Sequence, residues 1–245
     1  MSGHSKWSTI KRKKEKTDQQ RAKIFTKIGR ELIVAVKEGG GGDPSVNTKL
    51  YDVIQKAKQN NVPNDNIDRI IKKAAGEGDS SNYEEAVYEG YGPSGVAVIV
   101  EALTDNKNRT ASDLRHYFDK YGAGLGTPGC VSFMFSAVGM IVILKENIDE
   151  DKLMEDALEA GASDFNATDE VFEITTDSLD LRAVTEDLTA KGYIIESSEQ
   201  MKLPASFVSV TDIDLRAKME KLIEMMEDHD DVQEIYHNWE NQDEE

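Results

Sequence analysis

The sequence predicts an α+β protein of three domains, with a three-helix module at the N-terminus and two ferredoxin-like α/β domains, one inserted in the other. Three observations predict this class. Apolar residues follow a helical period up to Gly76, strand and helix patterns alternate after Asn82, and a compact βαββαβ order lies inside that second region. The expected boundaries are 1–78 for the helical module, 79–136 plus 205–240 for the first α/β domain, and 137–204 for the inserted domain.

The N-terminal module is expected to hold three short helices. After Thr17 and Asp18, an N-cap pair, one face repeats apolar residues at three- and four-residue spacing: Ile24, Phe25, Ile28, Leu32 and Val36. The glycine run 39–42 ends that helix. A second helix fits 46–60, and a third runs from Asn64, after the break at Pro63, to Gly76. Helices this short need mutual packing to be stable, so we expect one small bundle.

The first α/β domain is expected from two strand–helix–strand units that are far apart in the chain. One unit is a strand at 96–103, a helix at 109–121 and a strand at 131–135. The other is a strand at 206–210, a helix at 213–227 and a strand at 232–236. We expect the two units to pair into one sheet.

Between these units, the chain shows the complete split βαβ order. Strands are expected at 140–144, 164–167, 171–175 and 193–199, with helices at 150–160 and 180–191. The first of these strands is expected to start after a break at Gly139. This segment therefore predicts an inserted ferredoxin-like domain.

The charge of the chain changes sign at the end of the helical module. The 245 residues carry 29 Lys and Arg against 47 Asp and Glu, a net charge of −18. Residues 1–76 hold 17 basic and 8 acidic side chains (net +9), and residues 77–245 hold 12 and 39 (net −27). The net negative charge of the whole chain argues against a generic nucleic-acid-binding protein. A basic module on an acidic body instead indicates that phosphate binding is confined to one region.

The basic residues form an arm followed by a helix face. Lys and Arg neutralise phosphates, and aromatic side chains such as Trp7 and Phe25 suit stacking with bases. A merely solvated helix surface is the alternative interpretation. The predicted nucleic-acid contacts are Lys6, Trp7, Lys11, Arg12, Lys13, Lys14, Lys16, Lys23, Lys27 and Arg30, with Arg109 at the start of a later helix. Nothing in these residues distinguishes DNA from RNA.

No catalytic, cofactor-binding or metal-ligating residue is predicted. The segment Gly124–Gly129 matches G-x-G-x-x-G, but it follows a helix and contains Pro128, which indicates a structural loop. The single cysteine, Cys130, allows no internal disulfide and no Cys-based zinc site. The acidic run around His229 (Asp228, Asp230 and Asp231) is interpreted as a solvated turn.

The longest apolar stretches have five residues, far fewer than a membrane span needs, and residues 1–7 lack the apolar core of a signal peptide. We therefore expect a cytoplasmic protein with no membrane partner and no small-molecule substrate.

Several short motifs, spread over nearly the whole chain, resemble one known family. They are Gly3-His4-Ser5-Lys6-Trp7, Lys23-Ile24-Phe25-Thr26-Lys27, Gly40-Gly41-Gly42-Asp43-Pro44, Pro63-Asn64-Asp65-Asn66-Ile67-Asp68-Arg69, Tyr88-Glu89-Gly90-Tyr91-Gly92-Pro93, Thr104-Asp105-Asn106-Lys107-Asn108-Arg109-Thr110, Gly126-Thr127-Pro128-Gly129 and Asp231-Val232-Gln233-Glu234-Ile235-Tyr236-His237-Asn238. Together they resemble the YebC/PmpR family, which includes the mitochondrial translational activator of cytochrome c oxidase subunit one.

The resemblance implies three domains and no known catalytic activity. Members of the family are described as DNA-binding transcriptional regulators, and others resemble translation factors that act on the ribosome and its RNA. The sequence therefore predicts a non-enzymatic regulator of gene expression that binds nucleic acid, with transcriptional regulation through DNA as the first hypothesis and ribosome association as the alternative.

Overall fold

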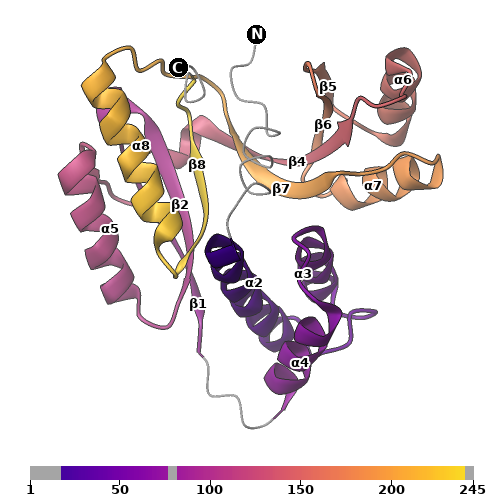
Figure 1. The fold of residues 1–245 in the computed structure, drawn as a ribbon, viewed down its shortest axis with the longest axis horizontal. Coiled ribbons are helices and arrows are strands. Elements are labelled where there is room, and N and C mark those ends of the chain that lie inside the picture. Colours follow the sequence, from indigo (N-terminus) through magenta and orange to yellow (C-terminus); the bar gives the residue numbers. More distant parts are fainter. Residues whose placement is uncertain (1–17, 77–81, 241–245) are drawn as a thin grey trace. The chain divides into compact units, whose positions relative to one another are not determined.

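Figure 1 shows the computed structural model of the chain, which describes residues 18–76 and 82–240, with side chains from Arg21 onward. The backbone divides into two compact units. One unit is the continuous segment Met134–Ser206, and the other combines the described chain on either side of it. Each unit has apolar cores of its own, so each is described as a separate body.

The helical module consists of α2 (Asp18–Glu38), α3 (Thr48–Gln59) and α4 (Asn64–Ala75), close to the three helices predicted. Its core is built from the apolar positions of the helical period. The fully or nearly buried members are Ile28, Leu32, Ala35, Val36, Leu50, Ala57, Val62, Ile67 and Ala74. Phe25 packs against this core and is half-buried, so the structure places it in the bundle and not among the exposed aromatics that could stack on bases.

The connection between α2 and α3 is held by one buried side chain, Asn47. Its side-chain oxygen caps α3 by accepting from the Leu50 amide at 2.9 Å. Its amide nitrogen donates to the carbonyl oxygens of Ala35 and Gly41 at 2.8 Å each. The glycine-rich segment is therefore fastened to the end of α2, and a side chain at Gly39 would collide with Asn47.

The first α/β domain is a four-stranded antiparallel sheet in the order β3-β1-β2-β8. Its strands are β1 (Glu84–Tyr91), β2 (Ala97–Thr104), β3 (Gly124–Leu125) and β8 (Val232–His237). Two helices, α5 (Lys107–Tyr121) and α8 (Ile213–Asp228), pack beside each other on the sheet (Figure 1). The shared core includes Val98, Val100, Leu114, Phe118, Met219, Leu222, Met226 and Trp239.

This sheet is assembled from other strands than the sequence predicted. The strand expected at 131–135 is wrong for its first four residues, because Ser132–Met134 form a 3-10 turn (η2). The strand expected at 206–210 is reduced to one bridge between Val208 and Trp239. Their places are taken by β1 and the two-residue β3, which the sequence interpretation missed.

A buried carboxylate explains why the chain turns at residues 129–132. Glu89, on β1, accepts hydrogen bonds from the backbone amides of Gly129, Val131 and Ser132, each at 2.8 Å. Burial alone would raise the pKa of Glu89, but these three bonds outweigh it and lower the pKa. The amides that a strand would use are therefore already occupied. The segment Gly124–Gly129, which the sequence predicted as a structural loop, begins with the two-residue strand β3 and continues without regular structure to Gly129.

The inserted unit has the predicted order β4-α6-β5-β6-α7-β7. Its elements are β4 (Phe135–Leu144), α6 (Glu150–Ala160), β5 (Asp164–Ala167), β6 (Val171–Asp177), α7 (Leu181–Ala190) and β7 (Ser197–Pro204). The strands form an antiparallel sheet in the ferredoxin-like order β5-β6-β4-β7. Gly139 lies inside β4 and does not break it; a side chain there would collide with Thr176 and Leu181.

The predicted fold class, a three-helix module followed by two α/β domains with one inserted in the other, is confirmed. The domain boundaries stay a prediction, because the helical module and the first α/β domain belong to the same compact unit.

Candidate nucleic-acid interface

Most of the predicted phosphate contacts belong to the N-terminal arm. The arm residues that lie outside the described part of the chain are Lys6, Trp7, Lys11, Arg12, Lys13, Lys14 and Lys16. The predicted contacts that the structure does describe are Lys23, Lys27, Arg30 and Arg109.

The cations of α2 point at an acidic turn of the same chain. This acidic turn, residues 227–231, links α8 to β8. Lys23 Nζ donates to Asp228 Oδ1 at 2.9 Å, and Lys27 Nζ donates to the carbonyl oxygen of Glu227 at 2.8 Å. One turn farther along α2, Arg30 donates to the Asp230 carbonyl oxygen at 2.7 Å. The basic face of α2 is therefore engaged within the chain.

Asp231 is the centre of this contact, and its side chain is only 3 % exposed. Its carboxylate accepts from Arg30 Nη1 at 2.7 Å and from Arg109 Nη2 at 2.8 Å. It also accepts from the hydroxyl groups of Thr110 at 2.8 Å and Thr104 at 3.0 Å. Two predicted nucleic-acid contacts, Arg30 and Arg109, are thus brought together on one buried carboxylate.

The charged form of Asp231 is strongly favoured. Burial by itself would raise the pKa of this carboxyl, but the hydrogen bonds from Arg109, Thr110, Arg30 and Thr104 outweigh burial and lower the pKa to about 2. Asp231 in turn raises the pKa of Arg109, with a second contribution from Asp105. The Asp231 carboxyl is therefore ionised throughout the physiological pH range.

The polar segment Thr104–Thr110 folds so that three of its side chains face Asp231. Asn106 caps α5 by accepting from the Arg109 amide at 3.1 Å. Because of this cap, the helix starts at a point from which Arg109 and Thr110 reach Asp231, the residue just before β8. The same nitrogen of Arg109, Nη2, also donates to Asp105 Oδ1 at 2.8 Å. The segment thus organises a salt bridge within the chain around Arg109, which the sequence predicted as a nucleic-acid contact.

Two further lysines join the helical module to the sheet. Lys56 Nζ lies 2.9 Å from Glu31 Oε1 and 3.3 Å from Glu234 Oε1. Lys49 Nζ lies 2.8 Å from Glu85 Oε1. Because Glu85 and Glu234 belong to strands of the first α/β domain, these pairs add to the contact made by Asp231.

Burial separates the α2 cations into two kinds. The Lys23–Asp228 pair is exposed at both ends (36 % and 57 %), and such pairs contribute only about 0–1 kcal/mol. Removing one partner of a buried pair such as Arg30–Asp231 costs about 3–5 kcal/mol. Lys23 can therefore exchange its partner for a phosphate at little cost, whereas Arg30 is held in place.

The sequence interpretation missed the role of Asp231. A solvated turn is correct for Asp228 and Asp230, which are exposed, and wrong for Asp231. The sequence did contain a signal for this role. One polar motif ends at Arg109-Thr110 and another begins at Asp231, and buried polar groups need hydrogen-bond partners, which these two motifs can supply to each other.

Comparison with protein families gives two matches that cover almost the whole chain. Residues 5–77 match the model described as "TACO1/YebC protein N-terminal domain", and residues 83–239 match "TACO1/YebC second and third domain". The chain belongs to the TACO1/YebC family. The family resemblance found in the sequence motifs is thereby confirmed.

Relatives in this family match along their full length. The chain is 55 % identical to a protein of Finegoldia magna (99 % of this chain, 100 % of the relative) and 58 % identical to one of Acetivibrio thermocellus (98 % and 99 %). Each of those relatives is named "Probable transcriptional regulatory protein". The crystal structure of a conserved hypothetical protein from Aquifex aeolicus is 44 % identical, with a TM-score of 0.82 over 92 % of each chain.

No helix in the described part of the chain is long and apolar enough to cross a membrane. Within residues 21–76 and 82–240, no group of three or more His, Cys, Asp and Glu side chains is placed to hold a metal ion.

Proposed function

We propose that this chain is a non-enzymatic, cytoplasmic regulator of transcription that binds DNA through its N-terminal module. The observation that carries the proposal is the charge division, +9 on residues 1–76 and −27 on the remainder. Family relatives of equal length that are named as transcriptional regulatory proteins support it. Phosphate attracts the module and repels the body, so the chain binds with one side toward the nucleic acid.

Within this proposal, the arm supplies most of the phosphate contacts. The described module, residues 18–76, holds 11 basic and 7 acidic side chains (net +4), so about half of the net charge of +9 on residues 1–76 belongs to residues 1–17. Lys and Arg of the arm neutralise phosphates, and Trp7 stacks on an exposed base or sugar face. Lys23 and Lys27 extend this contact along α2. Arg30 and Arg109 contribute by fixing α2 against the sheet.

The environment of Cys130 supports the proposal that the chain is not a thiol enzyme. Burial, with a smaller contribution from Glu89, raises the pKa of the Cys130 thiol. A raised pKa keeps the thiol protonated at neutral pH, and the protonated thiol is a poor nucleophile.

A salt titration tests the proposal. With roughly six or more phosphate contacts, the affinity for duplex DNA should fall about a thousandfold or more between low and moderate salt. Fluorescence anisotropy with a labelled mixed-sequence duplex measures this directly. The variant with Lys11, Arg12, Lys13 and Lys14 all changed to Ala should show a weaker affinity and a smaller salt dependence. A flat salt response, or an unchanged affinity in this variant, would contradict the proposal.

The alternative, a translation factor that associates with ribosomal RNA, stays a prediction from the family resemblance. Two measurements separate it from the proposed function. They are the same salt titration with a structured RNA in place of duplex DNA, and a test of whether the chain co-sediments with ribosomes. Ribosome co-sedimentation that depends on Lys11–Lys14, together with no measurable affinity for duplex DNA, would replace the proposed function with this alternative.

A further inference from the structure

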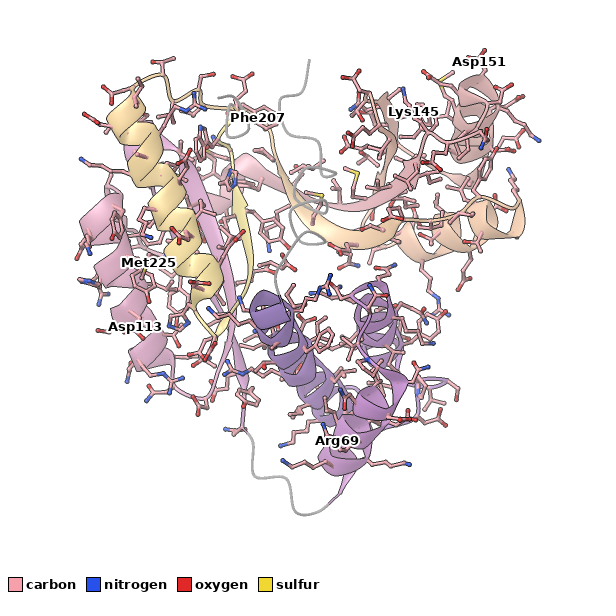
Figure 2. The ribbon with its side chains drawn as sticks, viewed as in Figure 1. Arg69, Asp113, Lys145, Asp151, Phe207 and Met225 are labelled. Atoms are coloured by element: carbon pink, nitrogen blue, oxygen red, sulfur yellow. The ribbon has the colours of Figure 1, made fainter. Side chains whose placement is uncertain are left out.

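Helix α4 presents three cations on its exposed side. Arg69, Lys72 and Lys73 are spaced three and four residues apart, so they lie within about one helical turn of each other, and all three are exposed. Arg69 is labelled on this helix in Figure 2. We call these three residues the α4 basic face.

The α4 basic face differs from the basic face of α2 in its partners. Within residues 21–76 and 82–240, Lys72 and Lys73 have no carboxylate partner, and Arg69 donates to the neutral side chain of Asn66 at 3.2 Å. The cations Lys23 and Arg30, in contrast, are already paired with Asp228 and Asp231. The cations of α4 therefore keep their charge available to a partner outside the chain.

Two carboxylates on α4, Asp65 and Asp68, limit the extent of the positive surface formed by the α4 basic face. Asp65 lies in the first turn, where negative charge interacts favourably with the helix dipole. By their four-residue spacing, Asp65 and Asp68 are the exposed neighbours of Arg69 and Lys72. Arg69 lies in the middle of α4, and Lys72 and Lys73 lie in its last turn. The positive surface thus begins at Arg69 and ends with the helix at Ala75.

The helix that carries this face is firmly held. Ile67 and Ala74 are buried in the module core, and the side chain of Ile70 packs close to Gly29 of α2. The loop at Gly42 approaches Ile71 and Ala75 so closely that a side chain on Gly42 would press against Ile71. The backbone of α4 is therefore fixed, and a ligand on the basic face orders only the three long side chains.

We propose that the α4 basic face binds the phosphodiester backbone of duplex DNA. The inference rests on the proposed function and names residues that the sequence interpretation did not select. Charge complementarity is the reason for this occupant: adjacent cations on one rigid turn match a row of phosphates, and they carry no base-reading pattern. The face therefore adds affinity without sequence preference.

The test compares two triple charge reversals of equal size. In one variant, Arg69→Glu, Lys72→Glu and Lys73→Glu remove the α4 basic face. In the control, the exposed residues of α5, α6 and α8 are changed by Lys120→Glu, Lys152→Glu and Lys218→Glu. Both variants change the net charge by the same amount, so a general repulsion of DNA affects them equally. Anisotropy with the labelled duplex is measured as a function of salt.

We expect the α4 variant to bind about tenfold or more weakly than the control, with a log–log salt slope smaller by about 2–3. A second α4 variant with the same three residues changed to Ala should show a smaller loss in the same direction. The residues are exposed, so circular dichroism and thermal melting should match the wild type; if the Glu variant fails to fold, the Ala variant decides.

Two results would overturn the inference, and they are distinguishable. If the wild type shows salt-dependent binding and the α4 variants bind like the control, the α4 basic face is not in the interface, while the proposed function stands. If the wild type itself does not bind the duplex in a salt-dependent way, the proposed function fails and the inference fails with it.

Discussion

Asp231 is a buried carboxylate whose charge is held by four donors. Two of them, Arg30 and Arg109, come from parts of the chain that are about 80 residues apart, and Asp231 itself lies more than 120 residues after either. A single side chain thereby connects the helical module with the sheet, the start of α5 and the end of α8. Buried charges of this kind are tolerated only when they are paired and fully hydrogen-bonded.

The change Asp231→Asn should destabilise this unit by about 3 kcal/mol, because it leaves two guanidinium groups facing a neutral amide. The melting temperature followed by circular dichroism should fall by roughly 6–12 °C, on the scale expected for a body of this size. The matched control is Asp230→Asn, an exposed neighbour, which should change stability by less than about 0.5 kcal/mol. Equal melting temperatures for Asp231→Asn and Asp230→Asn would show that the Asp231 carboxylate does not stabilise this unit.

The pKa of Asp231 also predicts how this contribution depends on pH. The folded pKa of about 2 lies below the ordinary value of 3.8, so the stabilisation is fully present above about pH 4 and is lost as the pH falls toward about 2. The difference in melting temperature between the wild type and Asp231→Asn should accordingly be constant from neutral pH to about 4 and should narrow below it. A constant difference down to pH 2 would contradict the lowered pKa.

At the scale of elements, the proposed function gives the basic face of α2 two roles, docking on the sheet and binding phosphate. Lys23 and Lys27, which are half-buried, contact the acidic turn, and Arg30 contacts the buried Asp231. The same helix can therefore remain docked on the sheet while its lysines turn to an outside phosphate. This division follows from burial alone, because the cost of breaking an ion pair rises steeply as the pair is removed from water.

Single substitutions on α2 should separate the two purposes. Lys23→Ala and Lys27→Ala should each lower the affinity for duplex DNA about threefold and leave the melting temperature within about 2 °C of the wild type. Arg30→Ala should instead lower the melting temperature by roughly 6–12 °C, like Asp231→Asn. Anisotropy and thermal melting on the same preparations check both. A large loss of melting temperature in the lysine variants, with none in Arg30→Ala, would contradict the roles given to these three residues.

The elements that could be predicted from the sequence are those with a clear period. The repeat from Ile24 to Val36 gave α2, and the order of short strands and helices after Gly139 gave the inserted domain. Strand β1 was missed because its first residues, Glu84 and Glu85, are acidic and exposed, so the apolar alternation is weak. The strand expected at 131–135 was wrong because the backbone amides of Val131 and Ser132 donate hydrogen bonds to Glu89, about 40 residues earlier, and not to a neighbouring strand.

The candidate site was less predictable than the fold. Sequence composition located the positive charge in residues 1–76, but it could not show which cations have partners. That depends on pairs such as Arg30 and Asp231, 201 residues apart, and no local pattern reports such a contact. For the same reason the α4 basic face was overlooked: Arg69, Lys72 and Lys73 alternate with apolar positions of an ordinary amphipathic helix.

At the scale of the whole molecule, the charge division is the feature that connects fold with function. An acidic body of −27 is repelled by phosphate, and a basic module of +9 is attracted to it. We therefore propose a direction of binding, in which the module contacts DNA and the α/β domains are repelled from the DNA backbone.

Photo-crosslinking of the full chain to a duplex with photoreactive groups along its backbone, followed by mass spectrometry, tests this claim most directly. The account predicts crosslinked peptides from residues 1–76, including the peptide that carries Arg69, Lys72 and Lys73. Crosslinks concentrated in the inserted domain, Met134–Ser206, or in α5 and α8 would contradict it.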